Sequence, residues 1–295
     1  MSPTALSEII EQVVKVLIGI CVAYYFRSDV YTAVTALLLA VTISECVALI
    51  FLWIRFHRIP APDKLLKNGA KTGIFGILRL SIPVTFSACL IPLFALIDSI
   101  LIVRLLSVYE ENAVTLYGLF SGGAVTIINL PVSVCYGIAA ASVPAISASV
   151  KKGKRSRKKL LYSVGLTFVV SLASAVGVYF FAEAAVSILF RSLAMEEAAI
   201  LTKLVRLFSV SAVTLSCTQT LSACLTALGR PTRAAIAMLF AMAVKTVLNV
   251  VLLKNPEYSI YGAAISASAG YFLSCLLDFF FALRATRRGK TRKTV

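Results

Sequence analysis

Eight apolar stretches, each long enough to cross a lipid bilayer, constrain the fold of this chain more than any other feature. About 20 apolar residues at a rise of ~1.5 Å per residue span the ~30 Å hydrocarbon core of a bilayer. Hydrocarbon offers the backbone no hydrogen-bond partner, so stretches of this length must be helical. The sequence therefore predicts an all-α, polytopic membrane protein with about eight transmembrane helices. The expected spans are Leu6–Phe26, Val30–Phe56, Leu80–Leu106, Tyr117–Val150, Leu160–Ala182, Ile200–Leu228, Thr232–Leu253 and Ile260–Leu283.

Charge supports this fold class and predicts an orientation. Only 14% of the residues are charged, against ~25% in ordinary globular proteins, and the net charge is +16. Basic residues gather in alternate connections and acidic residues in the others, which distinguishes cytoplasmic from outer loops. We expect a bacterial plasma-membrane protein with both termini in the cytoplasm and no nucleic-acid partner. The basic run KKGKRSRKK at 151–159 suits anionic lipid headgroups or acts only as a topology anchor.

The chain lacks the residue patterns of an enzyme, a metal site or a cofactor site. Its seven cysteines all lie inside apolar stretches without a CxxC motif, so we expect small buried side chains. The one histidine, His57, lies in a connection and leaves little material for a zinc or haem site. No GxSxG, HExxH or Walker glycine motif is present. We expect no catalytic activity, metal or cofactor.

The first and last helix pairs match each other at a constant offset of 230 residues. Val14-Lys15 aligns with Val244-Lys245 without a gap, and further matches join Tyr31 to Tyr261 and Arg58 to Arg288. Such repeats are typical of transporters built from two like bundles. The predicted domains are two transmembrane helices at the end of a first lobe (1–58), a basic cytoplasmic linker (59–79), a complete six-helix lobe (80–284) and a basic cytoplasmic tail (285–295).

The stretch Leu80–Leu106 carries residues that hydrocarbon excludes. Pro83 and Pro92 interrupt helical hydrogen bonding, and Asp98 is ionisable. Such residues are tolerated where neighbouring helices or a watery cavity satisfy the groups that they free. We expect this helix either to be kinked for packing or to line a cavity.

Charged residues within the predicted spans form the candidate site. Counting ~1.5 Å per residue from the outer helix ends places Asp98 and Lys245 ~12 Å inside and Arg206 ~9 Å inside, with Lys203 one turn nearer the surface. Asn249 shares the helix face of Lys245. One interpretation is a pocket whose cations bind an anionic group, such as the diphosphate of a lipid-linked sugar. In the other, Asp98 pairs with Lys245 or Arg206 for stability while Lys203 extends to the surface.

Four further ionisable residues have predicted roles. Lys15 and Glu45 are expected ~13 Å and ~15 Å from the inner ends of antiparallel neighbours, which predicts a structural ion pair. Alternatively, Lys15 faces the same cavity as Lys245, its partner in the repeat. Arg79, at the inner start of its helix, is a candidate ligand for a lipid diphosphate or a helix-end anchor. Asp278 is expected to pair with a basic neighbour.

Four motifs give the chain a resemblance to a known superfamily. They are LSIPVTF…LIDSILIVRLL at 80–106, NLPVSVCYGIAAASVPAIS at 129–147, LGRPTRAAIAMLFAMAVKTVLNVVLL at 228–253 and YSIYGAAISASAGY at 258–271. Together they resemble the multidrug/oligosaccharidyl-lipid/polysaccharide flippase superfamily, in its branch of stage V sporulation protein B and polysaccharide biosynthesis exporters.

The resemblance implies two six-helix lobes around a central cavity and transport by alternating access. The chain holds about half to two-thirds of the family's helices, so it resembles an N-terminally truncated member. The expected function is export of lipid-linked polysaccharide or peptidoglycan precursors. The expected partners are membrane lipids, the lipid-linked sugar substrate and a second chain or copy that supplies missing helices. Two alternatives stay open: a multidrug and toxin extrusion-type cation antiporter, which the mainly basic buried charges argue against, and an inactive or split-gene fragment of such a transporter.

Overall fold

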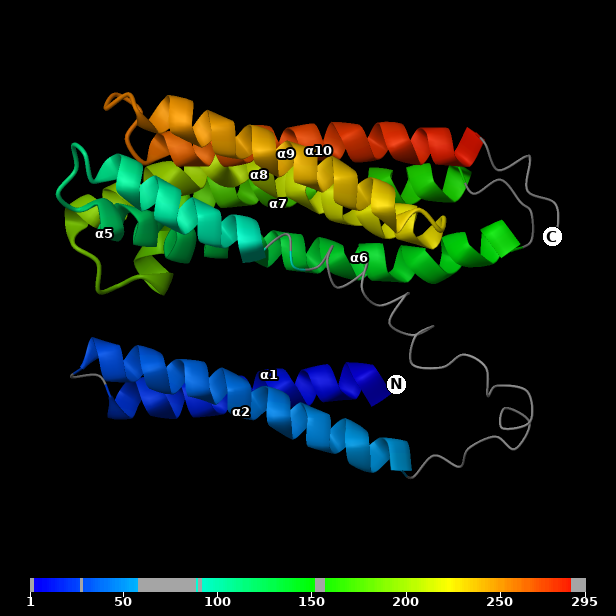
Figure 1. Ribbon diagram of the computed structural model, residues 1–295, viewed down its shortest axis with the longest axis horizontal. Helices are drawn as coiled ribbons and strands as arrows, with labels where there is room; N and C mark the ends of the chain where they lie inside the picture. Colours follow the sequence, from blue (N-terminus) through cyan, green and yellow to red (C-terminus); the bar gives the residue numbers. More distant parts are fainter. Residues whose placement is uncertain (1–2, 27–28, 58–88, 90–91, 152–156, 288–295) are drawn as a thin grey trace. The chain divides into compact units, whose positions relative to one another are not determined.

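The computed structural model describes residues 3–26, 29–57, 89, 92–151 and 157–287 (Figure 1). Within these ranges the chain is almost entirely helical, contains no strand, and has a helix in each of the eight predicted stretches. Six of the helices are long and apolar enough to cross a membrane. The prediction of an all-α, multi-pass membrane protein is confirmed. The chain divides into two compact units, Met1–Ile77 and Leu78–Val295, each of which we describe by itself.

The first unit is a helical hairpin of α1 (Pro3–Tyr25) and α2 (Val30–His57), which pack along each other. Asp29 helps to start α2, because its carboxylate accepts a hydrogen bond from the Tyr31 backbone N–H at 3.1 Å. Ala40, Ser44 and Ala48, spaced four residues apart on α2, are buried. Small residues at this spacing let two membrane helices approach closely.

The helix bounds agree with the repeat seen in the sequence. The last two helices of the chain are α9 (Pro231–Leu253) and α10 (Tyr261–Arg287). Moving them back by 230 residues gives 1–23 and 31–57, within two residues of the bounds of α1 and α2. Both pairs are therefore helical hairpins of nearly the same lengths, with 23 residues in α1 and in α9, 28 in α2 and 27 in α10.

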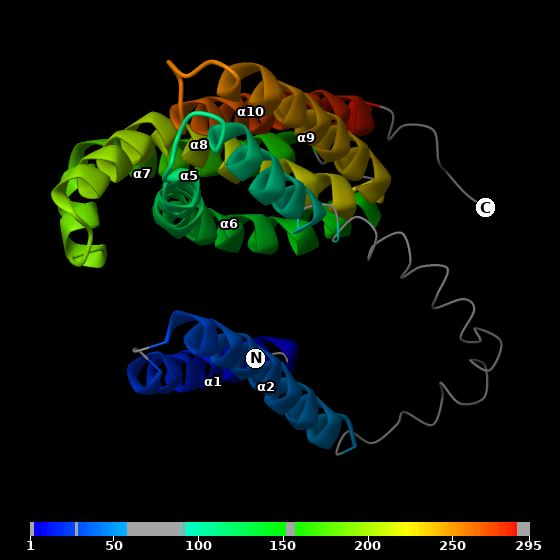
Figure 2. The same cartoon turned by 60° about the vertical axis from the view of Figure 1, so that its left-hand side comes forward.

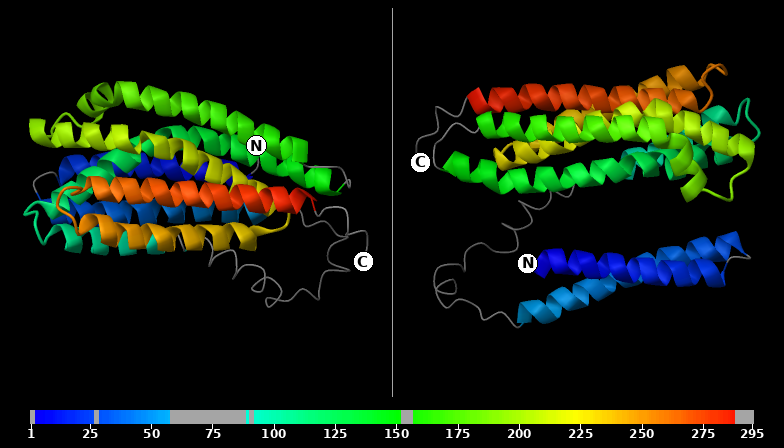
Figure 3. Two further views of the ribbon diagram at one scale, coloured as in Figure 1. Left: turned by 90° about the horizontal axis from the view of Figure 1, so that it is seen from above. Right: turned by 180° about the vertical axis from the view of Figure 1, so that it is seen from behind.

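Within the described part of the second unit, the first long helix covers residues 92–106 and is the unlabelled cyan helix in Figure 1. Its other elements are α5 (Ala113–Gly118), the π-helical turn η1 (Leu119–Ala124), α6 (Val125–Lys151), α7 (Arg157–Leu189), α8 (Met195–Ala227), α9 and α10. α5, η1 and α6 follow one another without a break. α8 packs against α6, α7, α9 and α10, and it lies between α6 and the α9–α10 pair in Figures 1 and 2. Figure 3 shows the same layers from above and behind.

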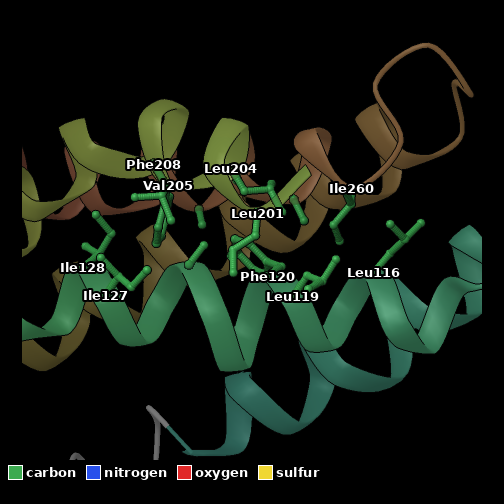
Figure 4. Close-up of a cluster of buried hydrophobic side chains, with 14 of the residues drawn as sticks. Leu116, Leu119, Phe120, Ile127, Ile128, Leu201, Leu204, Val205, Phe208 and Ile260 are labelled. Carbon is green, nitrogen blue, oxygen red and sulfur yellow. The ribbon is translucent and has the colours of Figure 1, made fainter. Parts of the chain in front are cut away.

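The main core of the second unit joins the α5–α6 path to α8 (Figure 4). Phe120 and Phe208 meet edge to face, with ring centroids 5.5 Å apart. Gly123 in η1 lets Leu201 of α8 approach, because a Cβ at position 123 would lie 2.5 Å from a Leu201 methyl carbon. A larger residue at position 123 would displace the buried Leu201 side chain where the π-helical turn meets the central helix.

Two helix ends differ from the sequence prediction by five residues or more. α7 continues to Leu189, past the predicted end at Ala182, and α8 begins at Met195 rather than at Ile200. Hydropathy identifies the part of a helix that suits lipid, whereas the helix itself ends where its backbone hydrogen bonds end. The additional turns carry polar residues such as Glu183 and Glu196.

Candidate functional site

A buried polar cluster in the second unit centres on Asp98, in the helix over residues 92–106. Asp98 is 7% exposed, and its Oδ2 forms an ion pair with Nζ of Lys245 on α9. Asn249, one turn further along α9, donates its Nδ2–H to the other Asp98 oxygen at 3.0 Å. A charge buried alone in a membrane helix costs about 2.5–3.5 kcal/mol on insertion scales, so mutual pairing lowers the cost of all three groups.

α10 completes the cluster from a third helix. The Ser266 hydroxyl donates a hydrogen bond to Oδ1 of Asn249, and the Tyr271 ring centroid lies 6.0 Å from Nζ of Lys245. A Cβ at Gly270 would lie 2.9 Å from Cβ of Lys245, so this glycine lets the lysine stem pass between α9 and α10. Both oxygens of Asp98 and the amide of Asn249 are therefore engaged. The cluster is electrically neutral and joins three helices.

Arg206 lies outside this cluster. It pairs with Glu183 of α7 at 3.6 Å, and the two side chains are 42% and 82% exposed. Lys203, one turn earlier on α8, is also exposed. The structure thus brings together Asp98, Lys245 and Asn249 but not the two predicted cations of α8. The Asp98–Lys245 pairing is the arrangement expected from the stability interpretation.

The predicted ion pair between Lys15 and Glu45 is wrong. Lys15 instead bonds Glu11 at 2.8 Å, and Glu45 is exposed on α2. Glu11 lies one turn earlier on the same helix, where an i, i+4 pair forms without any requirement on the rotation of a second helix. Arg79 lies outside the described residues.

Asp278 on α10 is a second buried carboxylate, and its predicted basic partner is absent from the described part of the chain. Asp278 is fully buried; one oxygen accepts a hydrogen bond from Ser222 of α8 at 2.8 Å. The other oxygen has no partner among the described residues. The position of Asp278 near the inner end of its predicted span favours a basic partner at the membrane surface, whereas in the structure its partner is a serine of α8.

Three residues of the site, Ser266, Gly270 and Tyr271, carry no charge and were not predicted from the sequence. All three lie in the motif YSIYGAAISASAGY at 258–271. Ser266 and Gly270 are small residues one turn apart on the same helix face, which is a usable signal of close packing against α9, whereas Tyr271 lies off that face. Which of the serines on that face bonds Asn249 depends on helix rotation, which sequence spacing does not give.

A family model described as "Polysaccharide biosynthesis protein" matches residues 1–150. The chain is 27% identical over 290 residues to stage V sporulation protein B of Bacillus subtilis (strain 168), covering 94% of this chain and 54% of that protein. It is 28% identical over 283 residues to the uncharacterized membrane protein YabM of the same organism, covering 92% and 52%. The chain thus spans about half the length of the curated relatives it matches.

Solved structures share the fold at low sequence identity. An inward-facing multidrug resistance MATE family transporter of the MOP superfamily matches with a TM-score of 0.74 at 17% identity, covering 98% of this chain and 65% of that one. An outward-facing structure of such a transporter matches with a TM-score of 0.70 at 16% identity, covering 97% and 63%. The chain belongs to the polysaccharide biosynthesis protein family.

Proposed function

We propose that the chain forms part of a bacterial plasma-membrane exporter that moves lipid-linked polysaccharide or peptidoglycan precursors by alternating access. Family membership supports the substrate class, and the buried Asp98–Lys245–Asn249 cluster is the observation that carries the assignment of a site. Residues 1–58 act as the end of a first lobe and 80–284 as the second lobe. The helices that complete the first lobe come from a longer protein, a second chain or a second copy.

In this mechanism Lys245 changes partner during transport. At rest its ammonium neutralises Asp98, and both groups are buried. A substrate diphosphate carries more charge than one carboxylate and forms strong charge-assisted hydrogen bonds, so it competes for the lysine. Asn249 then retains Asp98 through its amide. The interhelical bond therefore opens only when an anionic substrate replaces it.

The remaining predicted site residues have roles at the edges of the pathway. Arg206 and Lys203, exposed on α8, meet the substrate near the outer surface, and Arg206 exchanges Glu183 for phosphate. Arg79 receives the diphosphate on the cytoplasmic side. Lys15 lines the cavity in the first lobe. Both termini lie in the cytoplasm in this proposal, in agreement with the basic connections.

A double substitution tests the role of the cluster in transport. Asp98→Leu with Lys245→Met removes both charges together, and replacing a buried ion pair by apolar residues is often neutral for stability. In cells that make the precursor, we expect the double variant to reach the membrane in normal amount while export of the precursor to the outer leaflet falls at least tenfold. Lys254→Gln, at the exposed end of α9, is the control. Normal export by the double variant would show that the cluster serves stability alone.

A cation antiporter is the second candidate, favoured by Asp278. This buried carboxylate has an oxygen without a partner and no basic neighbour among the described residues, which suits a proton or a cation. Against it, Lys245 and Asn249 already occupy both oxygens of Asp98. Sodium- or proton-driven efflux of organic cations, abolished by Asp278→Asn, would favour the antiporter over the exporter.

A further inference from the structure

We infer that a groove between α6 and α7 binds an anionic membrane phospholipid. The groove has a volume of about 780 Å³, within the range of ~300–1,000 Å³ that is usual for small-molecule pockets. Its walls are mostly apolar, and two lysines, Lys158 and Lys159, stand at one end. This site is separate from the Asp98 cluster, and the inference does not depend on the proposed export function.

The groove exists because one face of α6 has small side chains. Gly137, Ala141 and Ala145 are spaced four residues apart and all line the groove. A Cβ at Gly137 would meet no atom within 4 Å, so the space beside this helix is open. A run of larger side chains at these three positions would fill it.

Polar contacts brace the two helices at the floor of the groove. The Ser142 and Ser163 hydroxyls bond each other at 2.8 Å, and Nζ of Lys159 donates to the Ala145 carbonyl at 3.1 Å. These bonds fix α6 against α7 in an antiparallel register. Both helices therefore bring their basic ends to the same side.

The polarity of the groove matches that of a lipid in one leaflet. Lys158 and Lys159 belong to the basic run at 151–159, at the end of the span. From Ala145 to Val134 the α6 wall then runs ~16 Å along the helix, at ~1.5 Å per residue, and Ser142, whose hydroxyl bonds Ser163, is the one polar residue among those of α6 that line it. A phosphate at the lysines places an acyl chain along Ala141, Gly137 and Val134. A single basic residue near the membrane surface adds ~1 kcal/mol to the binding of anionic lipid.

The few polar groups favour a phospholipid over a lipid-linked sugar. The hydroxyls of Ser142 and Ser163 are engaged with each other, which leaves the lysines and the Tyr162 hydroxyl to meet a headgroup. Two ammonium groups and a phenol suffice for one phosphate. Recognition of several sugar hydroxyls needs more donors and acceptors than this groove offers.

Native mass spectrometry of the purified chain in neutral detergent tests the inference with phosphatidylglycerol as the probe. We expect one phosphatidylglycerol to bind more tightly than phosphatidylcholine. Lys158→Gln should weaken the binding of phosphatidylglycerol about fivefold, which corresponds to ~1 kcal/mol, and should leave the binding of phosphatidylcholine unchanged. Gly137→Leu fills the groove and should weaken the binding of both lipids at least tenfold. The matched controls are Lys254→Gln, at the opposite membrane surface, and Gly177→Leu, another open glycine position on α7.

Several results would overturn the inference. They are unchanged binding by Gly137→Leu, equal binding of the two phospholipids by the original chain, displacement of phosphatidylglycerol by equimolar inorganic phosphate, and tighter binding of a lipid-linked sugar than of phosphatidylglycerol. Tyr162→Ala provides a second variant if Gly137→Leu does not fold, because this side chain is 74% exposed on α7. This variant should also weaken the binding of phosphatidylglycerol. Unchanged binding by a folded Tyr162→Ala variant would contradict the proposed lipid site.

Discussion

Breaking the Asp98–Lys245 pair one residue at a time should destabilise the second unit far more than removing both residues. Lys245→Met leaves a carboxylate in a site that is 7% exposed, with Asn249 as its remaining partner. Removing one member of a buried ion pair costs about 3–5 kcal/mol, because the other charge stays buried without compensation. Asp98→Leu leaves the Lys245 ammonium in the same position and should cost a similar amount.

The double variant Asp98→Leu, Lys245→Met should recover most of this loss. Apolar side chains of similar volume replace buried ion pairs at little cost, so we expect the double variant within ~1 kcal/mol of the original protein. At about 2–4 °C per kcal/mol for a unit of this size, each single variant should lower Tm by roughly 6–20 °C. The double variant should melt within a few degrees of the original.

A thiol-reactive fluorescent dye measures this unfolding directly. Cys135, Cys217 and Cys224 are free and buried in the second unit, so they react when it opens. Arg206→Met is the control, because its partner Glu183 is 82% exposed and a surface pair contributes only about 0–1 kcal/mol. A loss in Lys245→Met no larger than in Arg206→Met, or a double variant as unstable as the sum of the singles, would refute the buried pair.

Three further predictions use the same melting assay. Gly270→Ala should lower stability by about 1–3 kcal/mol, because the new Cβ would lie 2.9 Å from Cβ of Lys245. The control Gly165→Ala, in open space on α7, should be neutral or stabilising by up to ~1 kcal/mol. Asp278→Asn should raise Tm, because the amide can still accept the serine hydrogen bond and the unpaired charge is gone; a lowered Tm would mean that this carboxylate has a partner. Tyr109→Phe should cost about 0.5–1.5 kcal/mol by losing the 2.9 Å hydrogen bond to the Leu253 carbonyl. Burial raises the pKa of Tyr109 in the folded protein, so the contribution of Tyr109 to stability is full below about pH 10 and is lost as the pH rises through this higher pKa. An equal loss of stability at alkaline pH in Tyr109→Phe would show that Tyr109 is not the group responsible.

The number and positions of the helices could be predicted because hydrocarbon permits few alternatives. An apolar stretch of sufficient length must be a helix, so the bounds of α9 differ from the prediction by one residue. The depth of each charged residue in the membrane could also be predicted, by counting residues from the helix ends. This count places Asp98 level with Lys245, and the two form an ion pair in the structure. The same count placed Arg206 close to that level. Its side chain nevertheless bonds α7, because depth does not determine rotation about the helix axis.

The contacts that the sequence did not predict depend on the rotation of each helix about its axis and on how closely neighbouring helices approach. Ser266 joins the cluster because Gly270 allows α10 to lie against the stem of Lys245. Neither residue carries a charge, so neither was identified by a search for ionisable groups in hydrocarbon. A search for small residues at four-residue spacing finds Gly270 and Ser274, and it also finds Ala40 and Ser44 at the equivalent positions of α2.

The two lysines of the repeat differ in a way that bears on mechanism. Lys15 and Lys245 occupy equivalent positions, but Lys15 bonds Glu11 of its own helix and is 29% exposed. The position equivalent to Glu11 in the second hairpin is Ala241, so Lys245 has no acid one turn earlier and reaches Asp98 on another helix. A pair within one helix keeps its length when helices slide or rotate, whereas a pair between helices must stretch or break. Lys245 is therefore the lysine whose bonding can report and control a change in helix packing, and alternating access requires such a change.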